Sequence, residues 1–244
     1  MQVIKKLLRG IIWDWKRIFY DPEFDFSARP NIDYWHDRGC LRGSKLNSFQ
    51  LERMLLFQSY FHNEDSIFDV GSGTGETLVW LSKRGYDVTA SDFNSSLQHY
   101  YEDIGINYIN LDASRLSDYF QGRERPDYIT FFEVLEHIEV PENNILDAIK
   151  IAKKGVIFSI PNSTHYSYIL RMLIRGRFLC QWRVHPREHV RFWGVNDVKP
   201  WLEELLSGRQ FELNVLPYQR SFILGHFVPH LFARGIFVVI KKPE

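Results

Sequence analysis

A glycine-rich turn after a short apolar run restricts the fold of this chain more than any other feature. The run at residues 66–70 ends in Asp69-Val70, the turn is Gly71-Ser72-Gly73-Thr74-Gly75, and a helical pattern follows from Glu76. Glycines let a backbone approach a ligand closely, and the N-terminus of the next helix offers unpaired N–H groups. The order of strand, turn and helix therefore predicts the ligand-binding edge of an α/β sheet.

Apolar runs and helical patterns alternate along the rest of the chain. Strands that alternate with helices at this spacing predict a doubly wound parallel sheet with helices on both faces. The expected strands are 66–70, 87–91, 106–111, 127–132, 155–160, 211–215 and 235–240. The expected helices are 76–83, 95–104, 195–206 and one that opens at 133–137 and continues over 143–153.

Two carboxylates follow the second and third expected strands. Asp92 lies 21 residues after Gly71, where a carboxylate accepts hydrogen bonds from both hydroxyls of a ribose. Asp112, followed by Ala113, ends the third strand, where a carboxylate can meet an adenine amino group. The alternative for both residues is that they cap the helices that follow. The glycine turn and both carboxylates, in this order, favour a nucleoside-containing ligand.

The segment Phe68-Asp69-Val70-Gly71-Ser72-Gly73-Thr74-Gly75-Glu76 resembles motif I of the class I S-adenosylmethionine-dependent methyltransferases. Its G-x-G-x-G spacing differs from the G-x-G-x-x-G of dinucleotide-binding proteins. The resemblance covers about residues 45–215 and implies a Rossmann-like, seven-stranded mixed sheet that binds S-adenosylmethionine. Position 72 is Ser where many members have Cys. The implied cofactor-binding residues are Asp69, Gly71, Ser72, Gly73, Gly75, Asp92, Phe93, Asp112, Ala113 and Glu133.

An E-x-x-E-H pattern follows the fourth strand. Glu133, Glu136 and His137 stand at i, i+3 and i+4 of the expected helix, so their side chains should share one face and can coordinate a divalent cation such as Mg²⁺. The pattern resembles that of ubiquinone-biosynthesis O-methyltransferases and of small-RNA 3′-terminal 2′-O-methyltransferases. In the latter a later histidine completes the metal site, which implies His189 here, with His185 as the spare candidate. The alternative is a site without metal, in which Glu133 contacts the cofactor.

Methyl transfer from a sulfonium needs little activation of the methyl group itself. The protein must hold the acceptor in line behind the methyl and, for a hydroxyl acceptor, help to remove its proton. A histidine with a near-neutral pKa, or a metal that acidifies the hydroxyl, can do so. His137 is therefore the predicted catalytic residue, and His189 is the second candidate.

Residues 1–44 form an expected N-terminal extension to a methyltransferase domain at 45–244. Up to Phe19 the extension has five basic residues against Asp14 alone, and its apolar residues follow helical spacing. Such a helix either lies on a membrane surface or packs on its own domain or a second subunit. Tyr34 and Trp35 are expected to fold over the cofactor as a lid.

A basic cap is expected within residues 163–193, after the fifth strand. It carries six arginines against one acid, Glu188, and arginine suits phosphates and carboxylates because it binds them through two parallel hydrogen bonds. The alternative is a solvated amphipathic helix. The segment from Pro161 to Arg177 also resembles MetW-type proteins of methionine biosynthesis. The arginines are Arg171, Arg175, Arg177, Arg183, Arg187 and Arg191.

The expected function is O-methylation of an anionic small molecule, a lipid-linked precursor or a glycan. The alternatives are 2′-O-methylation of an RNA 3′ end and a non-catalytic, MetW-like partner protein. The chain has 30 basic and 30 acidic residues, which argues against a general nucleic-acid binder. Two distant cysteines, Cys40 and Cys180, and no secretory signal favour a cytoplasmic protein, with peripheral membrane contact through residues 1–20 left open.

Overall fold

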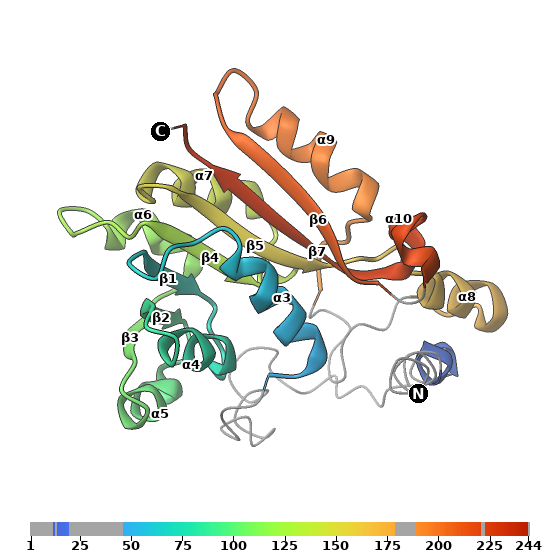
Figure 1. The fold of residues 1–244 in the computed structure, drawn as a ribbon, viewed down its shortest axis with the longest axis horizontal. Helices are drawn as coiled ribbons and strands as arrows, with labels where there is room; N and C mark the ends of the chain where they lie inside the picture. Colours follow the sequence, from blue (N-terminus) through green and yellow to red (C-terminus); the bar gives the residue numbers. More distant parts are fainter. Residues whose placement is uncertain (1–11, 13, 20–45, 179–188, 221–222, 244) are drawn as a thin grey trace.

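A seven-stranded mixed sheet forms the centre of the molecule (Figure 1). The structure is a computed structural model that describes residues 12, 14–19, 46–178, 189–220 and 223–243. The sheet has the order β3-β2-β1-β4-β5-β7-β6, in which β1 to β5 pair in parallel and β7 pairs antiparallel to both neighbours. The predicted fold class is thus confirmed. The strands are β1 Ser66–Val70, β2 Asp87–Asp92, β3 Asn107–Asn110, β4 Tyr128–Phe132, β5 Gly155–Pro161, β6 Glu212–Arg220 and β7 Ala233–Lys241.

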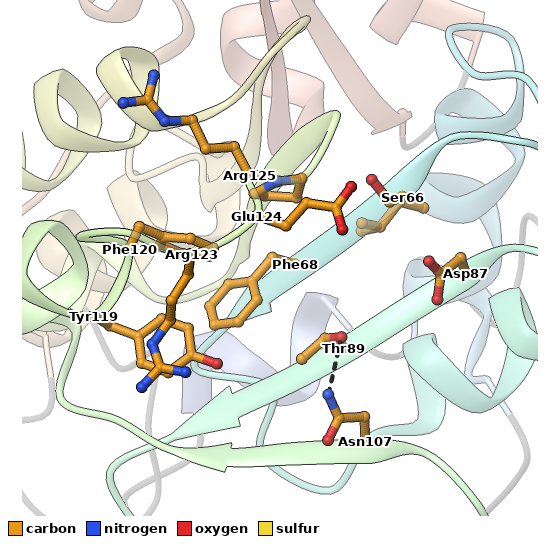
Figure 2. A pocket seen from close by; sticks show the side chains of 12 residues that line it. Ser66, Phe68, Asp87, Thr89, Asn107, Tyr119, Phe120, Arg123, Glu124 and Arg125 are labelled. Carbon is orange, nitrogen blue, oxygen red and sulfur yellow. Dashed lines mark hydrogen bonds between the residues drawn. The ribbon is translucent and has the colours of Figure 1, made fainter.

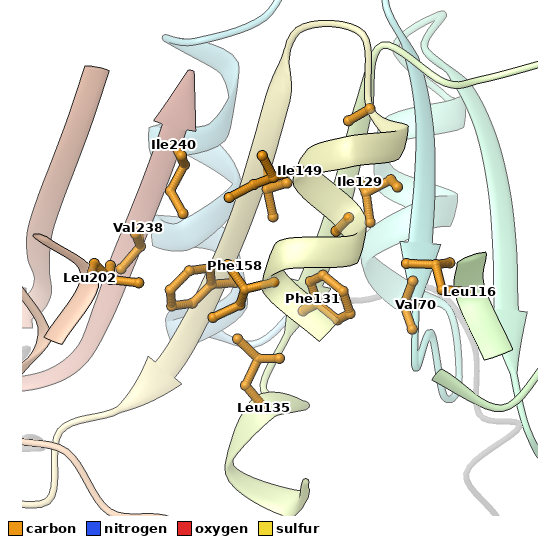
Figure 3. Close-up of a cluster of buried hydrophobic side chains, with 14 of the residues drawn as sticks. Val70, Leu116, Ile129, Phe131, Leu135, Ile149, Phe158, Leu202, Val238 and Ile240 are labelled. Carbon is orange, nitrogen blue, oxygen red and sulfur yellow. The ribbon is translucent and has the colours of Figure 1, made fainter. Parts of the chain in front are cut away.

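Helices cover both faces of this sheet because its central strands are apolar on both sides. In β4, Ile129 and Phe131 pack with α6, α7 and α9 on one face (Figure 3), whereas Tyr128 and Phe132 pack with α3, α4 and α5 on the other. Alternation of side chains along a strand explains this division. The α-helices are α3 Ser48–Gln58, α4 Glu76–Ser82, α5 Gln98–Asp103, α6 Leu116–Tyr119, α7 Pro141–Ile151, α8 Tyr166–Arg175, α9 Val195–Leu205 and α10 Pro229–Phe232. Short 3-10 turns are η1 Ser95–Leu97, η2 Ala113–Arg115, η3 Leu135–His137 and η4 Ile223–His226.

The last two strands are longer than the sequence predicts. Expected at 211–215 and 235–240, each spans nine residues in the structure. The extension is possible because Gly235 leaves room for the ring of Tyr218 on the neighbouring strand: a Cβ at Gly235 would lie 2.4 Å from that ring. The longer strands place Tyr218 near the carboxyl end of β5, because Gly235 pairs with both Tyr218 and Pro161.

The N-terminal extension is described at residues 12 and 14–19, which are helical and are called here the N-terminal helix. It packs on the cap, since Asp14 accepts a 2.7 Å hydrogen bond from the Tyr166 hydroxyl and pairs with Arg234. Packing on its own domain, one of the expected alternatives, is therefore found for this helix. The expected lid residues Tyr34 and Trp35 lie outside the described residues. No helix among the described residues is both long enough and apolar enough to span a bilayer.

Candidate active site

The glycine turn is built around backbone conformations that glycine favours. Gly71, Gly73 and Gly75 have φ of 72°, 51° and 72°. The N–H groups of Gly71 and Ser72 donate to Ser91 O at 2.8 and 2.9 Å, which joins the turn to the end of β2. A Cβ at Gly75 would lie 2.6 Å from the Tyr101 hydroxyl, so this position has no room for a side chain. The turn follows the end of β1 and so lies at the carboxyl edge of the sheet.

Asp92 connects the second strand to the glycine turn. Its carboxylate accepts hydrogen bonds from Gly73 N and Asn94 N, both at 3.0 Å. The side chain is buried, and burial raises its pKa. Phe93, the next residue, is half-exposed at the same edge. The structure thus brings the predicted ribose-binding carboxylate against the predicted cofactor-binding turn.

Asp69 lies beneath the turn, within the sheet. It accepts a 2.5 Å hydrogen bond from the Thr130 hydroxyl and so links β1 to β4. Burial raises its pKa to about 7, against the opposing effects of the Thr130 hydrogen bond and the Arg53 charge. Asp69 therefore fixes the end of β1, from which the glycine turn begins, to the neighbouring strand β4.

Asp112 caps the 3-10 turn η2. Its Oδ1 accepts from Ser114 N at 2.8 Å and from Ser114 Oγ at 2.7 Å, which is the capping alternative recognised in the sequence. Ala113 is half-buried, and its carbonyl accepts from Asn144 Nδ2 at 2.9 Å. The side chain of Asp112 is exposed, so capping leaves it accessible to a ligand.

The prediction that a helix begins at Glu133 is wrong. Glu133 adopts φ of 60°, a left-handed conformation that ends the strand, and the 3-10 turn Leu135–His137 follows before α7 begins at Pro141. A side chain in this conformation cannot lie on a helix face shared with Glu136 and His137. Glu133 Oε1 instead accepts from Ser159 Oγ at 2.7 Å and from the Tyr218 hydroxyl at 3.3 Å.

Arg53 is a site residue that the sequence analysis missed. It extends from α3 into the sheet edge, where it donates to Ser159 Oγ and Thr77 Oγ1 at 3.1 Å each and lies 3.7 Å from Glu133 Oε1. Burial raises the pKa of Glu133, and the Arg53 charge opposes that effect. One feature of the sequence could have identified it: Arg53 precedes Met54 in a short segment whose apolar residues follow helical spacing. An arginine buried on such a helix needs an acidic or polar partner.

Glu136, His137 and His189 form a compact group at the end of β4. One ligand atom from each lies within 4.8 Å of the others, and the two imidazole rings are 4.7 Å apart. Val190 N and Arg191 N donate to Glu136 O at 2.8 and 3.2 Å, which holds His189 in place. The structure therefore brings together three of the four predicted metal ligands. His185, the spare candidate, lies outside the described residues.

The electrostatics of this group separate its two histidines. Burial, and then the His137 charge, lower the pKa of His189 to about 3, so that its imidazole stays neutral at physiological pH. His137 is accessible, with 43% of its side chain exposed. Burial, and then the charge of Glu133, raise the pKa of Glu136 well above its ordinary value. His137 is thus the member of the group that an acceptor molecule can reach.

The same group fits a divalent metal. Glu136 Oε2 is buried without a hydrogen-bond partner among the described residues, and the neutral imidazole of His189 is a good nitrogen donor. Two imidazoles and one carboxylate suit a first-row transition metal better than Mg²⁺, which prefers an all-oxygen set. This donor set therefore gives no support to the expected Mg²⁺.

The glycine turn and the histidine group belong to one site. A Cβ at Gly71 would lie 2.6 Å from Cγ2 of Val134, which precedes Glu136 by two residues. By contrast, the hollow of about 330 Å³ in Figure 2 lies at the amino ends of β1, β2 and β3, where Ser66, Asp87 and Asn107 line it. No predicted site residue lines that hollow. Ligands of such sheets bind at the opposite edge, at the carboxyl ends of the strands.

Two of the cap arginines, Arg171 and Arg191, donate to backbone carbonyls. Arg171 is buried and donates to the carbonyls of Arg17, Ile18 and Phe178. Arg191 donates to Glu139 O. These contacts fix the cap and the N-terminal helix in place. Arg183 and Arg187 lie outside the described residues.

The strand order, the glycine turn and the carboxylate at the end of β2 define the class I S-adenosylmethionine-dependent methyltransferases. Residues 34–205 match the family described as methyltransferase domain, and the chain belongs to that family. The expected class, fold and cofactor, S-adenosylmethionine, are thereby confirmed.

Ubiquinone biosynthesis O-methyltransferases are among the similar curated proteins. The enzyme of Hydrogenovibrio crunogenus is 33% identical over 156 residues, which are 59% of this chain and 63% of that protein. The enzyme of Erwinia tasmaniensis is 28% identical over 174 residues, which are 67% of this chain and 65% of that protein. The chain thus spans slightly less than two thirds of the length of these relatives.

Solved structures with the same fold include an S-adenosylmethionine-dependent methyltransferase from Archaeoglobus fulgidus. It has a TM-score of 0.58 and 17% identity, with 86% of this chain and 99% of that chain covered. Magnesium protoporphyrin IX methyltransferase from Synechocystis, solved with S-adenosylhomocysteine, has a TM-score of 0.54 and 16% identity, with 95% and 94% covered. At this identity the likeness shows the fold.

Proposed function

We propose that the protein transfers a methyl group from S-adenosylmethionine to a hydroxyl oxygen of an anionic small molecule, a lipid-linked precursor or a glycan. The observation that carries the proposal is the group of Glu136, His137 and His189 beside the glycine turn. A methyl donor and a base that can remove a hydroxyl proton would meet there. The names of the O-methyltransferase relatives support an oxygen acceptor.

In this proposal the cofactor lies along the carboxyl ends of β1, β2 and β4. The glycine turn and Glu133 hold its methionine part, Asp92 accepts from the ribose hydroxyls, and Asp112 meets the adenine amino group. Ser72, Phe93 and Ala113 line the same path. Preorganisation favours this assignment, since Asp92 already bonds to Gly73 N and Glu133 is held by Ser159.

His137 acts as the general base. Its imidazole accepts the proton of the acceptor hydroxyl while the oxygen attacks the methyl carbon, and the bond from that carbon to sulfur breaks. The products are the methyl ether, S-adenosylhomocysteine and protonated His137. His189, neutral and buried, orients His137 through the ring contact at 4.7 Å.

A divalent metal would be held by Glu136, His137 and His189. When bound, it would supply a Lewis acid that lowers the pKa of the acceptor hydroxyl. His137 would then serve as a ligand, and His137 and His189 together would fix the acceptor position. Loss of turnover in EDTA, restored by Mn²⁺ or Zn²⁺, supports this form of the site, whereas full activity in EDTA supports the metal-free base.

The test is methyl transfer by the full chain and by a His137→Ala variant. We expect His137→Ala to lose turnover by about 100-fold or more and to keep its affinity for S-adenosylmethionine, because the base contributes to the chemical step. The panel of acceptors contains quinol precursors, sugar nucleotides and short RNAs. His99→Ala is the matched control, since 95% of the His99 side chain is exposed and it pairs with Glu102 of the same helix.

Equal turnover of the His137→Ala variant would refute the assigned base. Transfer to RNA 3′ ends alone would replace the proposed acceptor with the RNA alternative. Cofactor binding without transfer to any acceptor would favour a MetW-like partner protein, for which the intact histidine group has no chemical use.

A further inference from the structure

Residues 189–193 connect the histidine group to the chain that follows β5, and we call them the His189 segment. The segment begins at His189 and ends at Trp193, just before α9. Ser163 N donates to Trp193 O at 2.8 Å. Trp193 is buried, and its ring lies 5.0 Å from the ring of Trp201 on α9. This end of the segment is therefore fixed by the core of the domain.

Arg191 joins the same segment to the loop that follows β4. Its backbone N–H donates to Glu136 O at 3.2 Å, and its guanidinium donates to Glu139 O through Nε at 2.8 Å and through Nη2. The two carbonyls stand on either side of His137 in the chain. One residue thus links both flanks of His137 to the segment that carries His189.

The guanidinium contact suits this use. Two N–H groups of one planar group that bind a single carbonyl define the orientation of the side chain, and a charged donor makes a stronger hydrogen bond than a neutral one. The turn that carries His137, Leu135–His137, has only three residues. Since a 3-10 turn of this length has few internal hydrogen bonds, contacts from outside it determine where His137 lies.

We propose that Arg191 is a positioning residue for methyl transfer: it fixes the turn that carries His137 against the His189 segment and so holds the two imidazoles 4.7 Å apart. The inference rests on the proposed function, in which His137 is the base. Arg191 acts through the two histidines and takes no part in the proton transfer. Its role is the same where the histidines hold a metal, because both ligands then need a fixed separation.

Steady-state kinetics of two variants test the proposal. Arg191→Ala should lower kcat by about 10-fold and keep both its affinity for S-adenosylmethionine and its KM for the acceptor within about twofold, because displaced catalytic groups slow the chemical step. Arg191→Lys keeps the charge and a single donor, so it should recover part of the loss. Guanidinium ions added to Arg191→Ala should also raise kcat, and they should leave the unmodified chain unchanged.

Arg84→Ala is the matched control. Arg84 is likewise an exposed arginine whose guanidinium donates to a backbone carbonyl, at 3.2 Å to Trp80 O, but its bond lies within the end of α4. This variant should keep the kcat of the unmodified chain, and guanidinium ions should not change it.

Reactivity toward diethyl pyrocarbonate tests the position of His189 without methyl transfer. The reagent modifies accessible neutral imidazoles, and His189 is only 9% exposed. Arg191→Ala should raise the rate at His189 by about fivefold or more, because the segment opens more often once its hydrogen bonds are lost. Mass spectrometry at single residues measures the rate, with the exposed His99 as the internal reference.

Either an unchanged kcat or an unchanged reactivity of His189 in Arg191→Ala would overturn the proposal. A raised KM for an anionic acceptor at unchanged kcat would overturn it too, since Arg191 would then bind the acceptor. Absence of methyl transfer by the unmodified chain is a different result: it contradicts the proposed function, whereas the reactivity of His189 still reports whether Arg191 fixes the segment.

Discussion

Three tyrosines near the cofactor turn differ in what their hydroxyl groups contact. Tyr101 donates to Gly73 O at 3.0 Å, and Tyr108 donates to Asp92 O and Asn94 O at 3.0 and 2.7 Å. Their rings stack 4.9 Å apart. The hydroxyl of Tyr100 is buried without a hydrogen-bond partner among the described residues. Tyr101 and Tyr108 therefore position the two loops on which we place the cofactor.

Removing these hydroxyls should weaken cofactor binding more than it weakens the fold. Tyr101→Phe and Tyr108→Phe should each lower affinity for S-adenosylmethionine by about 3- to 10-fold, since the first removes a hydrogen bond to one loop carbonyl and the second removes hydrogen bonds to two. Calorimetric titration measures the change, and kcat at saturating cofactor should stay within about twofold. Tyr100→Phe is the matched control and should leave affinity unchanged. A loss that is the same in all three variants would contradict the positioning role.

At the scale of elements, helix α8 begins with a histidine cap. The imidazole of His165 accepts from Ser167 N, and the side chain is fully buried. Burial, followed by the charges of Arg234 and Arg17, lowers the pKa of His165 to about 3. The cap therefore needs a neutral imidazole, and its contribution depends on pH.

Acidification should destabilise the folded chain through His165. In the unfolded chain a histidine takes up a proton below about pH 6.5, whereas the folded chain resists protonation down to about pH 3. This contribution to stability is complete above pH 6.5 and is lost progressively as the pH falls toward 3. Between pH 7.5 and 5 the unmodified chain should lose roughly 2 kcal/mol more unfolding free energy than His165→Asn, which caps without titrating.

Urea unfolding at the two pH values measures this difference. The cavity left by the smaller asparagine lowers stability equally at both pH values, so it cancels from the comparison. His99→Asn, at an exposed site, should behave like the unmodified chain. Parallel losses in His165→Asn and the unmodified chain would contradict the buried neutral imidazole.

The sequence predicts the elements of this fold well where local chemistry determines them. The apolar run before Gly71 and the alternation that follows identify all seven strands, because period and turn residues are local signals. The same reasoning fails at Glu133. The spacing of E-x-x-E-H predicts a helix, but it does not indicate that its first residue has a left-handed backbone conformation. Backbone strain of this kind is maintained by distant contacts, here with Ser159 and Tyr218.

Contacts between distant segments also explain why the sequence did not predict Arg53 and Tyr218 as residues of the candidate site. Arg53 and Tyr218 reach Glu133 from α3 and β6, and no spacing rule connects segments so far apart in the chain. The arginines of the cap show the reverse case. A count of charges suggested a ligand site, whereas Arg171 and Arg191 donate to backbone carbonyls. Charge composition cannot distinguish an arginine that binds a ligand from one that binds backbone carbonyls, because both arrangements provide acceptors for the hydrogen-bond donors of the guanidinium group.

At the scale of the whole molecule, the neutral net charge combines two unlike parts. The cofactor edge gathers carboxylates, among them Asp69, Asp92 and Glu133, each with a raised pKa. The described part of the N-terminal helix and α8 carry cations, among them Lys16, Arg17 and Arg175. The proposed site for a cationic sulfonium thus lies in the acidic part of the molecule.

Calorimetric titration of the full chain with S-adenosylmethionine tests the central claim most directly. We expect one cofactor to bind per chain, and Asp92→Asn to weaken binding by about 10-fold or more, because it replaces charged hydrogen bonds to the ribose with neutral ones. Asp87→Asn, at the exposed amino end of the same strand, is the matched control and should bind like the unmodified chain. No binding by the unmodified chain, or equal binding by Asp92→Asn and Asp87→Asn, would contradict the assigned cofactor site.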